Sequence, residues 1–554
     1  MTVDPVTLEV VRNATAAVAE EMNATLVRTS YSPNIKDRKD CSCAVFDADG
    51  ELVSQAENIP VHLGAMPFSV AAALDKFPPE SLEPGDEILL NDPFHGGAHL
   101  PDLTLVNPAF VDGELIGFLA NRAHHADIGG ATAGSVAADS TEIYQEGLRL
   151  PPVKLSAGGT VNEAIVDLFL ANVRTPAERR GDLRAQQAAN RTGVDRLTEL
   201  HDRYDDLSGI LDEIQDYAER RMRAEIGELP DGEYSFADAL DDDGQGTEDL
   251  PIDVTVSVDD DSIQVDFDGT AEQVRGAINA PFAVTASATY YAFRCVTDPE
   301  IPPNAGAYRP IEITAPEGTI VNAQPPAAVV GGNLEVSQRV TDALLGAIGT
   351  VAPERAAAAG QGTMNNLTFG GMDPRTESPY TFYETLGGGF GGRTGADGMD
   401  GVHVHMSNTL NTPAEVLESA YPLRVTDYSY RPDSGGAGEF RGGLGLRRDI
   451  EALAETTFSL LADRRTHRPY GLTGGEPGAP GADYLITDDE TEPIPAKSTH
   501  RLQAGDVVSI RTPGGGGYGD PADRDPESIR RDLAAGKLSP DSARSAYDFD
   551  PSGT

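Results

Sequence analysis

The sequence predicts an α+β protein of several domains, with mixed and antiparallel sheets and a helical segment after an N-terminal region that carries a candidate metal site. Three observations support this fold class. The chain has 554 residues, whereas a single hydrophobic core stops growing near about 250–300 residues. Apolar residues recur at spacings of three and four in residues 4–30 and 160–226, as in amphipathic helices. From residue 251 onward they alternate in short runs, which is typical of antiparallel strands.

The first 237 residues are predicted to form the N-terminal α+β domain. A helix is expected over residues 4–30, with Asp4 and Pro5 as its cap and first turn. Strands and glycine turns follow to about residue 155. The helical segment then comprises three predicted helices, over residues 163–173, 179–204 and 206–226.

The remainder is divided into a central mixed β/α domain, 238–440, and a C-terminal β-rich region with a helical tail, 441–554. The acidic, glycine-bearing stretch DALDDDGQGTEDL at 238–250 is expected to be a hairpin tip or a boundary. A helix is predicted over residues 333–350, and the last 30 residues carry the helical tail. No repeat with a period of 20–50 residues is visible, which argues against a solenoid.

The charge balance limits which partners the protein can bind and indicates the salt concentration in which it works. Asp and Glu number 89 against 42 Lys and Arg, of which only six are lysines, and the acidic excess is spread along the chain. Such a field argues against binding to nucleic acid or to an anionic membrane surface. It suits concentrated salt, where charges are screened over about 3 Å, and so indicates a halophilic source, with an acidic mesophilic protein as the alternative.

The location is expected to be cytoplasmic. The first residues, MTVDPVTLEVVRN, lack the basic and apolar regions of a secretory signal. No window approaches the roughly 18 apolar residues of a membrane span. The three cysteines, Cys41, Cys43 and Cys295, form neither an even disulfide framework nor a complete zinc site.

Histidine is concentrated in one short region. Residues 91–110, NDPFHGGAHLPDLTLVNPAF, and the two residues at 124–125 together hold four of the ten histidines of the chain. Two apolar runs joined by Asp112-Gly113 predict a β-hairpin, because both central positions of such a turn favour positive φ. If these two residues form the turn, Val111 pairs with Glu114 and His124 lies opposite Pro101, next to His99 and Asp102.

Two imidazoles and one carboxylate that converge in this way form a three-ligand set with room for water or substrate. His99, Asp102 and His124 are therefore the predicted ligands of a divalent metal, with Mn, Fe, Co and Zn all open. Strict alternation would place Asp102 on the face of His125 instead, so His125 is the reserve ligand. The alternative is a set of hydrogen-bonded histidines in a glycine-rich turn. Asp92, His95 and Asp127 are expected either to orient the ligands or to cap turns.

Several stretches resemble the hydantoinase B/oxoprolinase family. They include NDPFHGGAHLPDLTLV, RAHHADIGG, QAENIPVHLGAM, GGNLEVSQRVTDAL and TPGGGGYGDP, and the likeness runs from residue 4 to the end. That family includes the B-type subunit of N-methylhydantoinase, the corresponding half of ATP-dependent 5-oxoprolinase, and a related component of acetone and acetophenone carboxylases. The resemblance implies an A-type ATPase partner subunit that binds ATP, a hetero-oligomer, and a metal on His99, Asp102 and His124.

The resemblance implies an enzyme subunit for ATP-dependent opening of a cyclic amide, of hydantoin or 5-oxoproline type. The partner would phosphorylate this small-molecule substrate, and this chain would supply a metal-activated water, with His125 or Asp127 as the catalytic proton carrier. The glycine runs at 386–395 and 512–519 lack the features of a phosphate-binding loop, which agrees with ATP on the partner. The alternatives are the metal-binding subunit of a ketone carboxylase and a non-catalytic scaffold for the ATPase subunit.

Overall fold

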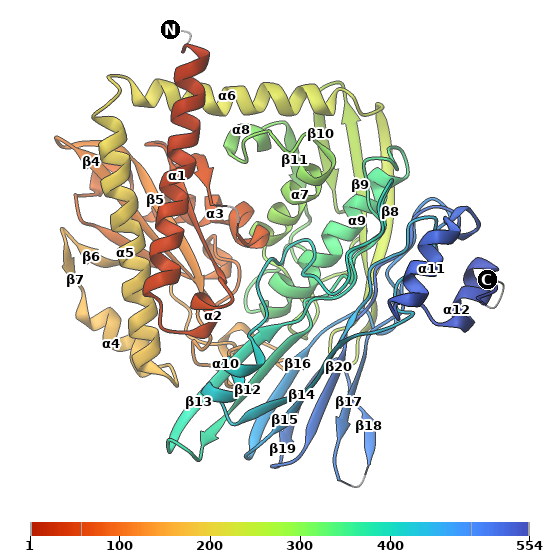
Figure 1. Cartoon of the computed structure of the whole chain (residues 1–554). Coiled ribbons are helices and arrows are strands. Elements are labelled where there is room, and N and C mark those ends of the chain that lie inside the picture. The colour runs from red at the N-terminus through yellow and green to blue at the C-terminus, as the bar shows by residue number, and fades with distance from the viewer. Residues whose placement is uncertain (1–2, 57, 489, 552–554) are drawn as a thin grey trace.

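The computed structural model describes residues 3–56, 58–488 and 490–551, and it has an α+β architecture built on four sheets (Figure 1). The pairings within the sheets are antiparallel, apart from one parallel pair in the second sheet. This arrangement confirms the predicted fold class. No helix within the described residues is long and apolar enough to cross a membrane.

The first sheet forms the N-terminal part and has the strand order β2-β1-β5-β4-β3-β6-β7. Its strands are β1 (Cys41–Phe46), β2 (Leu52–Gln55), β3 (Glu87–Leu90), β4 (Asp102–Val111), β5 (Glu114–His124), β6 (Val153–Ala157) and β7 (Thr160–Val161). Helices cover both faces. The helices α1 (Pro5–Thr29) and α5 (Pro176–His201) pack side by side against one face (Figure 1), and α3 (Pro60–Lys76) packs against the other.

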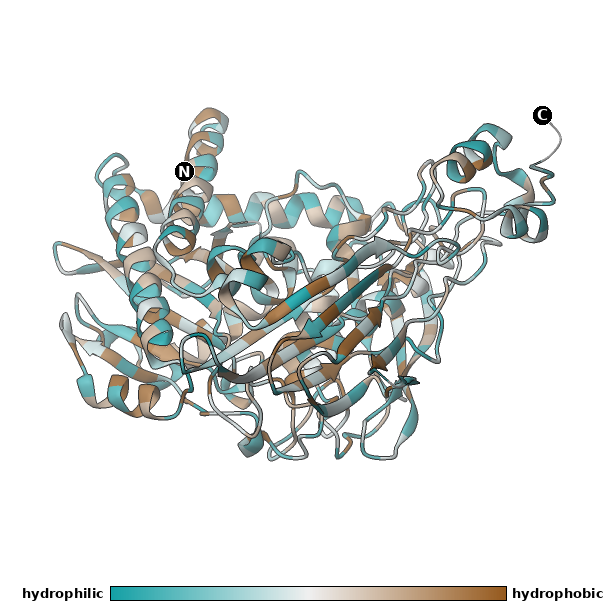
Figure 2. Ribbon diagram, turned by 60° about the horizontal axis from the view of Figure 1, so that its bottom comes forward, coloured by the Kyte–Doolittle hydropathy of each residue, from teal (hydrophilic) through white to brown (hydrophobic). Residues whose placement is uncertain are grey.

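The predicted helices of this part are present. The N-terminal helix α1 begins after Asp4, whose carboxylate accepts hydrogen bonds from the backbone N–H groups of Val6 and Thr7, as expected for a cap. The apolar stripe of α1 faces α5 and the sheet, and apolar and polar residues alternate along both helices (Figure 2). The remaining two helices of the predicted segment are α4 (Glu163–Ala171) and α6 (Leu207–Ile226).

The second sheet, in the order β11-β10-β9-β8, supports the central helices. It consists of β8 (Gly232–Asp242), β9 (Glu248–Asp259), β10 (Ser262–Asp266) and β11 (Ile311–Thr314). The acidic stretch 238–250 forms the tip of the β8–β9 hairpin, as one of its two interpretations predicted. Positions 237 and 238 lie inside β8, and the three-part division of the chain stays a prediction.

Three helical elements lie between this sheet and α3. They are α7 (Phe282–Val296), a π-helical turn η4 (Gly332–Val336), and α9 (Ser337–Gly349). The predicted helix at 333–350 is thus present, but its first turn is π-helical and the rest is α-helical. Single π-turns widen a helix locally and are frequent at functional sites.

The C-terminal part is formed by two sheets that share one apolar core. One has the order β13-β12-β16-β19 and the other β14-β15-β20-β17-β18. Their strands are β12 (Asn366–Asp373), β13 (Ser378–Thr385), β14 (Leu423–Tyr430), β15 (Leu446–Ala452), β16 (Thr456–Leu461), β17 (Ala482–Ile486), β18 (Thr491–Pro493), β19 (Lys497–Leu502) and β20 (Val507–Arg511). The helical tail, α11 (Pro526–Ala534) and α12 (Pro540–Tyr547), lies at the end of this part (Figure 1).

Glycine-rich segments pack backbone against backbone beside these sheets. The Gly515 N–H donates to the Gly443 carbonyl at 2.9 Å, and the Gly443 N–H donates to the Phe390 carbonyl at 2.8 Å. A Cβ atom on Gly389 would lie 2.1 Å from the carbonyl oxygen of Gly443, which is far inside van der Waals contact. The glycine runs therefore serve close packing of the backbone.

Candidate metal centre

The predicted hairpin is present, but its register differs by one residue at the end that matters. Val111 pairs with Glu114 across the Asp112-Gly113 turn, as expected. A β-bulge then inserts Ile116, so that farther along the hairpin Asp102 lies directly opposite His124. The expected pairing of His124 with Pro101 is wrong for this reason.

The bulge depends on a glycine. Gly117 has φ +153°, and a Cβ atom there would lie 2.4 Å from the carbonyl oxygen of Phe46 on the neighbouring strand. Only glycine combines this conformation with such a close approach. The extra residue also decides the question of faces, because it places Asp102 and His124 on the same side of the sheet, toward α3.

Three donor atoms meet on this side of the sheet. His99 Nε2 lies 3.0 Å from Asp102 Oδ1 and 3.1 Å from His124 Nδ1, and that nitrogen lies 3.1 Å from the same carboxylate oxygen. His99 and Asp102 are fully buried, and His124 is 2% exposed. The three residues form a cluster with the composition of a metal site.

The geometry of this triangle fits a divalent cation. Bonds of about 2.1 Å set at right angles place neighbouring donor atoms about 3.0 Å apart, whereas tetrahedral bonds of that length place them about 3.4 Å apart. Hydrogen bonds alone satisfy these three atoms poorly. A ring N–H that points at the Asp102 carboxylate does not point at the nitrogen of the other imidazole. Two histidines and one carboxylate on one face of a cation leave further coordination positions open.

The surroundings shift the pKa values of Asp102 and His124 in the directions that a bound cation requires. Burial alone would raise the pKa of Asp102, but the neighbouring His99 and His62 hold it well below the usual value. Burial lowers the pKa of His124, although Asp40 and Asp102 oppose this effect. Metal binding needs an ionised carboxylate and a neutral imidazole, and the shifts of Asp102 and His124 favour these two states.

Further side chains around the triangle were not predicted from the sequence. His62 Nε2, at the start of α3, lies 3.3 Å from Asp102 Oδ2 and 3.8 Å from Asp40 Oδ1. Asn333, in the π-helical turn η4, places its side-chain nitrogen 3.2 Å from His99 Nε2. Tyr383 of β13 stacks on the His124 ring, with centroids 4.6 Å apart. His62 and Asn333 lie in the family-like stretches QAENIPVHLGAM and GGNLEVSQRVTDAL, which were the available signal.

The structure does not bring His125 and Asp127 into the triangle. His125 follows His124 in an extended segment, so its ring lies on the opposite face of the sheet, where Nε2 is 3.0 Å from Gln186 Oε1 of α5. Asp127 pairs with Arg174 at 2.9 Å. Their expected role as proton carriers at the metal therefore has no geometric support, because strand alternation directs His125 away from it.

Asp92 and His95 form a local turn rather than a support for the ligands. The Asp92 carboxylate accepts a hydrogen bond from the Phe94 N–H and pairs with His95 Nδ1 at 2.9 Å, within the 3-10 turn η2 (Pro93–His95). The His95 side chain is 61% exposed. The turn-capping alternative accounts for both residues.

A small cavity of about 20 Å³ lies beside the triangle, lined by Asp40, His62, His124, Asn333 and Tyr383 among others. This volume admits about one water molecule. The cavity beside the triangle is thus too small for an organic ligand in this conformation.

Comparison with known proteins places this chain in a family. The family model for hydantoinase B/oxoprolinase matches residues 4–521. The chain is 36% identical to a putative D-/L-hydantoinase B-type subunit from a Pseudomonas species, over 98% of this chain and 95% of the relative. It is 39% identical to 5-oxoprolinase 1 of Arabidopsis thaliana, over 93% of this chain, but it spans only 42% of that longer protein.

A solved structure agrees over the full length. The ATP-dependent caprolactamase from Pseudomonas jessenii superposes with a TM-score of 0.93 at 34% identity, covering 100% of this chain and 97% of the other. The sequence comparison and the structural comparison agree, and the chain belongs to the hydantoinase B/oxoprolinase family.

Proposed function

We propose that the chain is the B-type subunit of an ATP-dependent hydrolase of cyclic amides, in which an A-type partner binds ATP and activates the substrate. The names of its relatives support this class, since they include the B-type component of a hydantoinase, a 5-oxoprolinase and an ATP-dependent caprolactamase. The single observation that carries the proposal is the buried triangle of His99, Asp102 and His124. Packing of a protein interior does not by itself require three such metal-donor atoms at one point.

In this proposal His99 Nε2, Asp102 Oδ1 and His124 Nδ1 hold a divalent cation. A cation bound there supplies Lewis acidity, which lowers the pKa of a nearby water toward about 7. Donor atoms 3.0–3.1 Å apart would suit a six-coordinate ion with bonds at right angles, such as Mn²⁺ or Fe²⁺, better than tetrahedral Zn²⁺.

The surrounding residues orient these ligands and move the proton. His62 contacts the second oxygen of Asp102 and fixes the carboxylate, while Tyr383 restrains the His124 ring by stacking. His62 also lines the small cavity together with Asp40, so this pair, rather than His125 or Asp127, is placed to accept a proton from a water held there.

The test is reconstitution with the partner. The purified chain is mixed with the A-type subunit, and ATP turnover is followed with hydantoin, 5-oxoproline or caprolactam. We expect ATP-dependent ring opening from the mixture and none from either component alone. ATP-dependent hydrolysis by this chain by itself would refute the division of labour. Bicarbonate-dependent consumption of acetone without lactam hydrolysis would replace the proposal with a ketone carboxylase, and full activity of a metal-free His99→Ala complex would indicate a scaffold.

A further inference from the structure

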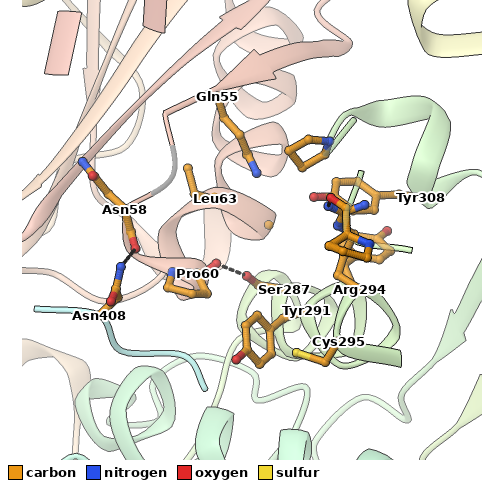
Figure 3. Close-up of a pocket in the computed structure, with 14 residues that line it drawn as sticks. Gln55, Asn58, Pro60, Leu63, Ser287, Tyr291, Arg294, Cys295, Tyr308 and Asn408 are labelled. Carbon is orange, nitrogen blue, oxygen red and sulfur yellow. Dashed lines mark hydrogen bonds between the residues drawn. The ribbon is translucent and has the colours of Figure 1, made fainter. Parts of the chain in front are cut away.

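The β4–β5 hairpin is packed differently on its two faces. On the α3 side, Pro60 and Leu63 line a cavity of about 380 Å³ (Figure 3). Val61 and His62 line the cavity of about 20 Å³ beside the triangle. The start of α3 thus lies between two cavities, so part of this face borders open space rather than packed side chains. A rigid support for the ends of β4 and β5 is expected on the other face, which α5 covers.

Buried side-chain amides form a ladder on that other face, between α5 and the two strands. The amide ladder consists of Gln186 and Asn190 on α5, Asn121 on β5, and Asn107 on β4. Gln186 Nε2 donates to Asn121 Oδ1 at 2.9 Å, and Asn121 Nδ2 donates to Asn190 Oδ1 at 2.6 Å. Asn190 Nδ2 in turn donates to Asn107 Oδ1 at 2.7 Å. Asn107 is 5% exposed and the other three side chains are fully buried, so these hydrogen bonds form away from water.

The amide ladder also binds the main chain of β4. Gln186 Nε2 donates to the Leu103 carbonyl and Asn190 Nδ2 donates to the Leu105 carbonyl, both at 2.9 Å. Four residues of a helix rise by about 6.0 Å and two residues of a strand by about 6.8 Å, so positions four apart on α5 match alternate residues of β4. Apolar contacts are not directional. The hydrogen bonds therefore fix the position of α5 along the strand.

Gln186 holds both strands directly behind two of the proposed ligands. Its Nε2 binds the carbonyl of Leu103, the residue after Asp102. Its Oε1 lies 3.0 Å from Nε2 of His125, the residue after His124. Asp102 and His124 lie directly opposite each other in the hairpin and project to the α3 side. One side chain therefore restrains the two strand ends that carry these ligands.

The same contacts determine the tautomer of His125. A carbonyl oxygen only accepts, so the Gln186 atom that faces Leu103 is the amide nitrogen, and its two protons go to Leu103 and Asn121. The amide oxygen then faces His125 Nε2, which has to carry a proton. His125 Nδ1 is buried and has no hydrogen-bond partner among the described residues, so a proton there would be unsatisfied. We expect the Nε2–H tautomer, which can be measured without a metal.

We propose that Gln186 is a positioning residue of the metal centre, which acts from the opposite face of the sheet by holding the strand ends that carry Asp102 and His124. The donor atoms of these two residues lie 3.1 Å apart, and a binding constellation has to be held to within about 0.5 Å. Without Gln186 the two ends are free to separate. The effect on a cation rests on the proposed function, whereas the restraint on the strands does not.

The experiment is titration of the chelator-treated full chain with Mn²⁺, followed by the EPR signal of the free ion, for the wild type and for Gln186→Met. Methionine is similar in size to glutamine but makes none of its three hydrogen bonds. The variant keeps all three proposed ligands. We expect it to bind one equivalent of Mn²⁺ with an affinity lower by about tenfold or more, as for other residues that orient metal ligands.

The matched control is Gln187→Met, on the same helix. Gln187 is 8% exposed, and its Nε2 donates to the buried Glu87 carboxylate at 2.5 Å rather than to the amide ladder. Each substitution removes a partner of a buried polar group, so both should lower the melting temperature of the metal-free chain. Only Gln186→Met should also lower the affinity for Mn²⁺. A purely structural role would make affinity follow stability in both variants.

Nitrogen-15 NMR of the metal-free wild type, labelled in histidine, tests the restraint itself. His125 should be protonated at Nε2, and Gln186→Met should lose this preference. If Gln186→Met does not fold, Gln186→Glu replaces it, because glutamate keeps the acceptor for His125 but loses both N–H donors. The same loss of Mn²⁺ affinity is expected.

Three results would overturn this role of Gln186: wild-type Mn²⁺ affinity in its variant, an equal loss of affinity in Gln187→Met, or a His125 proton on Nδ1. Failure of the proposed function is distinguishable. It would appear as the expected Mn²⁺ affinities together with no ATP-dependent hydrolysis by the assembled complex. A wild-type chain that binds no Mn²⁺ would remove both the metal centre and the role of Gln186 in it.

Discussion

Two neighbouring histidines provide a sharp test of the metal centre, because they differ by one position and by the face of the sheet. His124 contributes one of three donors to the triangle, while His125 contacts Gln186 on the opposite face. We expect His124→Ala to lose the metal and the activity of the reconstituted complex. We expect His125→Ala to keep a full equivalent of metal.

The magnitudes follow from the contacts. Structural sites with four ligands bind Zn²⁺ with about 10–16 kcal/mol, which is about 3 kcal/mol for each ligand and about 10²-fold in affinity for losing one. His125→Ala instead leaves Gln186 Oε1 buried and unpaired, at about 1–3 kcal/mol of folding stability. That second variant should therefore melt several degrees lower than the wild type while retaining its metal.

The assay is metal analysis of both purified variants and the wild type after dialysis, together with thermal unfolding. His99→Ala serves as the positive control for metal loss, and it should behave as His124→Ala does. If the His125 variant lost its metal while the His124 variant retained it, the register imposed by the bulge at Ile116 would be wrong. If all three variants held as much metal as the wild type, the triangle would be a hydrogen-bonded cluster.

Three further predictions concern other parts of the molecule. His62→Gln should retain metal but slow turnover of the complex by about 10²–10⁴-fold if His62 carries the proton, and an unchanged rate would exclude that role. Burial raises the pKa of Glu146 to about 8, while its Oε1 accepts the backbone N–H groups of Val329 and Val330 just before η4. The folded state holds the Glu146 proton more tightly than the unfolded state, in which the pKa is near 4.5. Protonation of Glu146 therefore contributes fully to stability below pH 4.5. This contribution is lost as the pH rises from there to about 8, at about 1.4 kcal/mol per pH unit. The Glu146→Gln variant should accordingly have the same unfolding free energy as the wild type near pH 4.5 and a higher one near pH 8. Parallel curves of unfolding free energy against pH would contradict this. Finally, a formal charge of −47 should make the melting temperature rise from low to molar KCl, and a flat or falling profile would remove the halophilic interpretation.

Local patterns in the sequence were sufficient for many of the elements. The cap at Asp4, the Asp112-Gly113 turn and the three helices between 163 and 226 follow from short-range rules and appear as predicted. The turn could be identified because two residues determine its conformation. Its far end could not be, because the bulge at Ile116 depends on the close approach of Gly117 to Phe46, a contact between strands distant in the sequence.

The same limit applies to the site. His99, Asp102 and His124 come from one hairpin and the loop before it, so their convergence was accessible to reasoning from spacing. His62 and Asn333 arrive from a helix and a π-helical turn that pack onto the hairpin only in the folded chain. Their contribution is tertiary, and no periodicity in the sequence encodes it. The expectation that His125 carries the proton lacks geometric support for the related reason that sequence adjacency to a ligand says nothing about which face of a sheet a side chain occupies.

The glycine segments near Gly389, Gly443 and Gly515 imply an uneven tolerance of mutation. A single base change in a glycine codon yields mostly larger residues, and at these positions the first added carbon would overlap a main-chain oxygen, for example at 1.9 Å for Gly443. Side-chain rearrangement cannot relieve an overlap with the main chain. In a saturation mutagenesis screen for soluble expression, substitutions in this region should thus be depleted as strongly as substitutions of His99, Asp102 and His124 in a screen for activity, although these glycines do not line the candidate metal centre. Engineering of this chain would therefore have to keep these glycines and place its substitutions elsewhere.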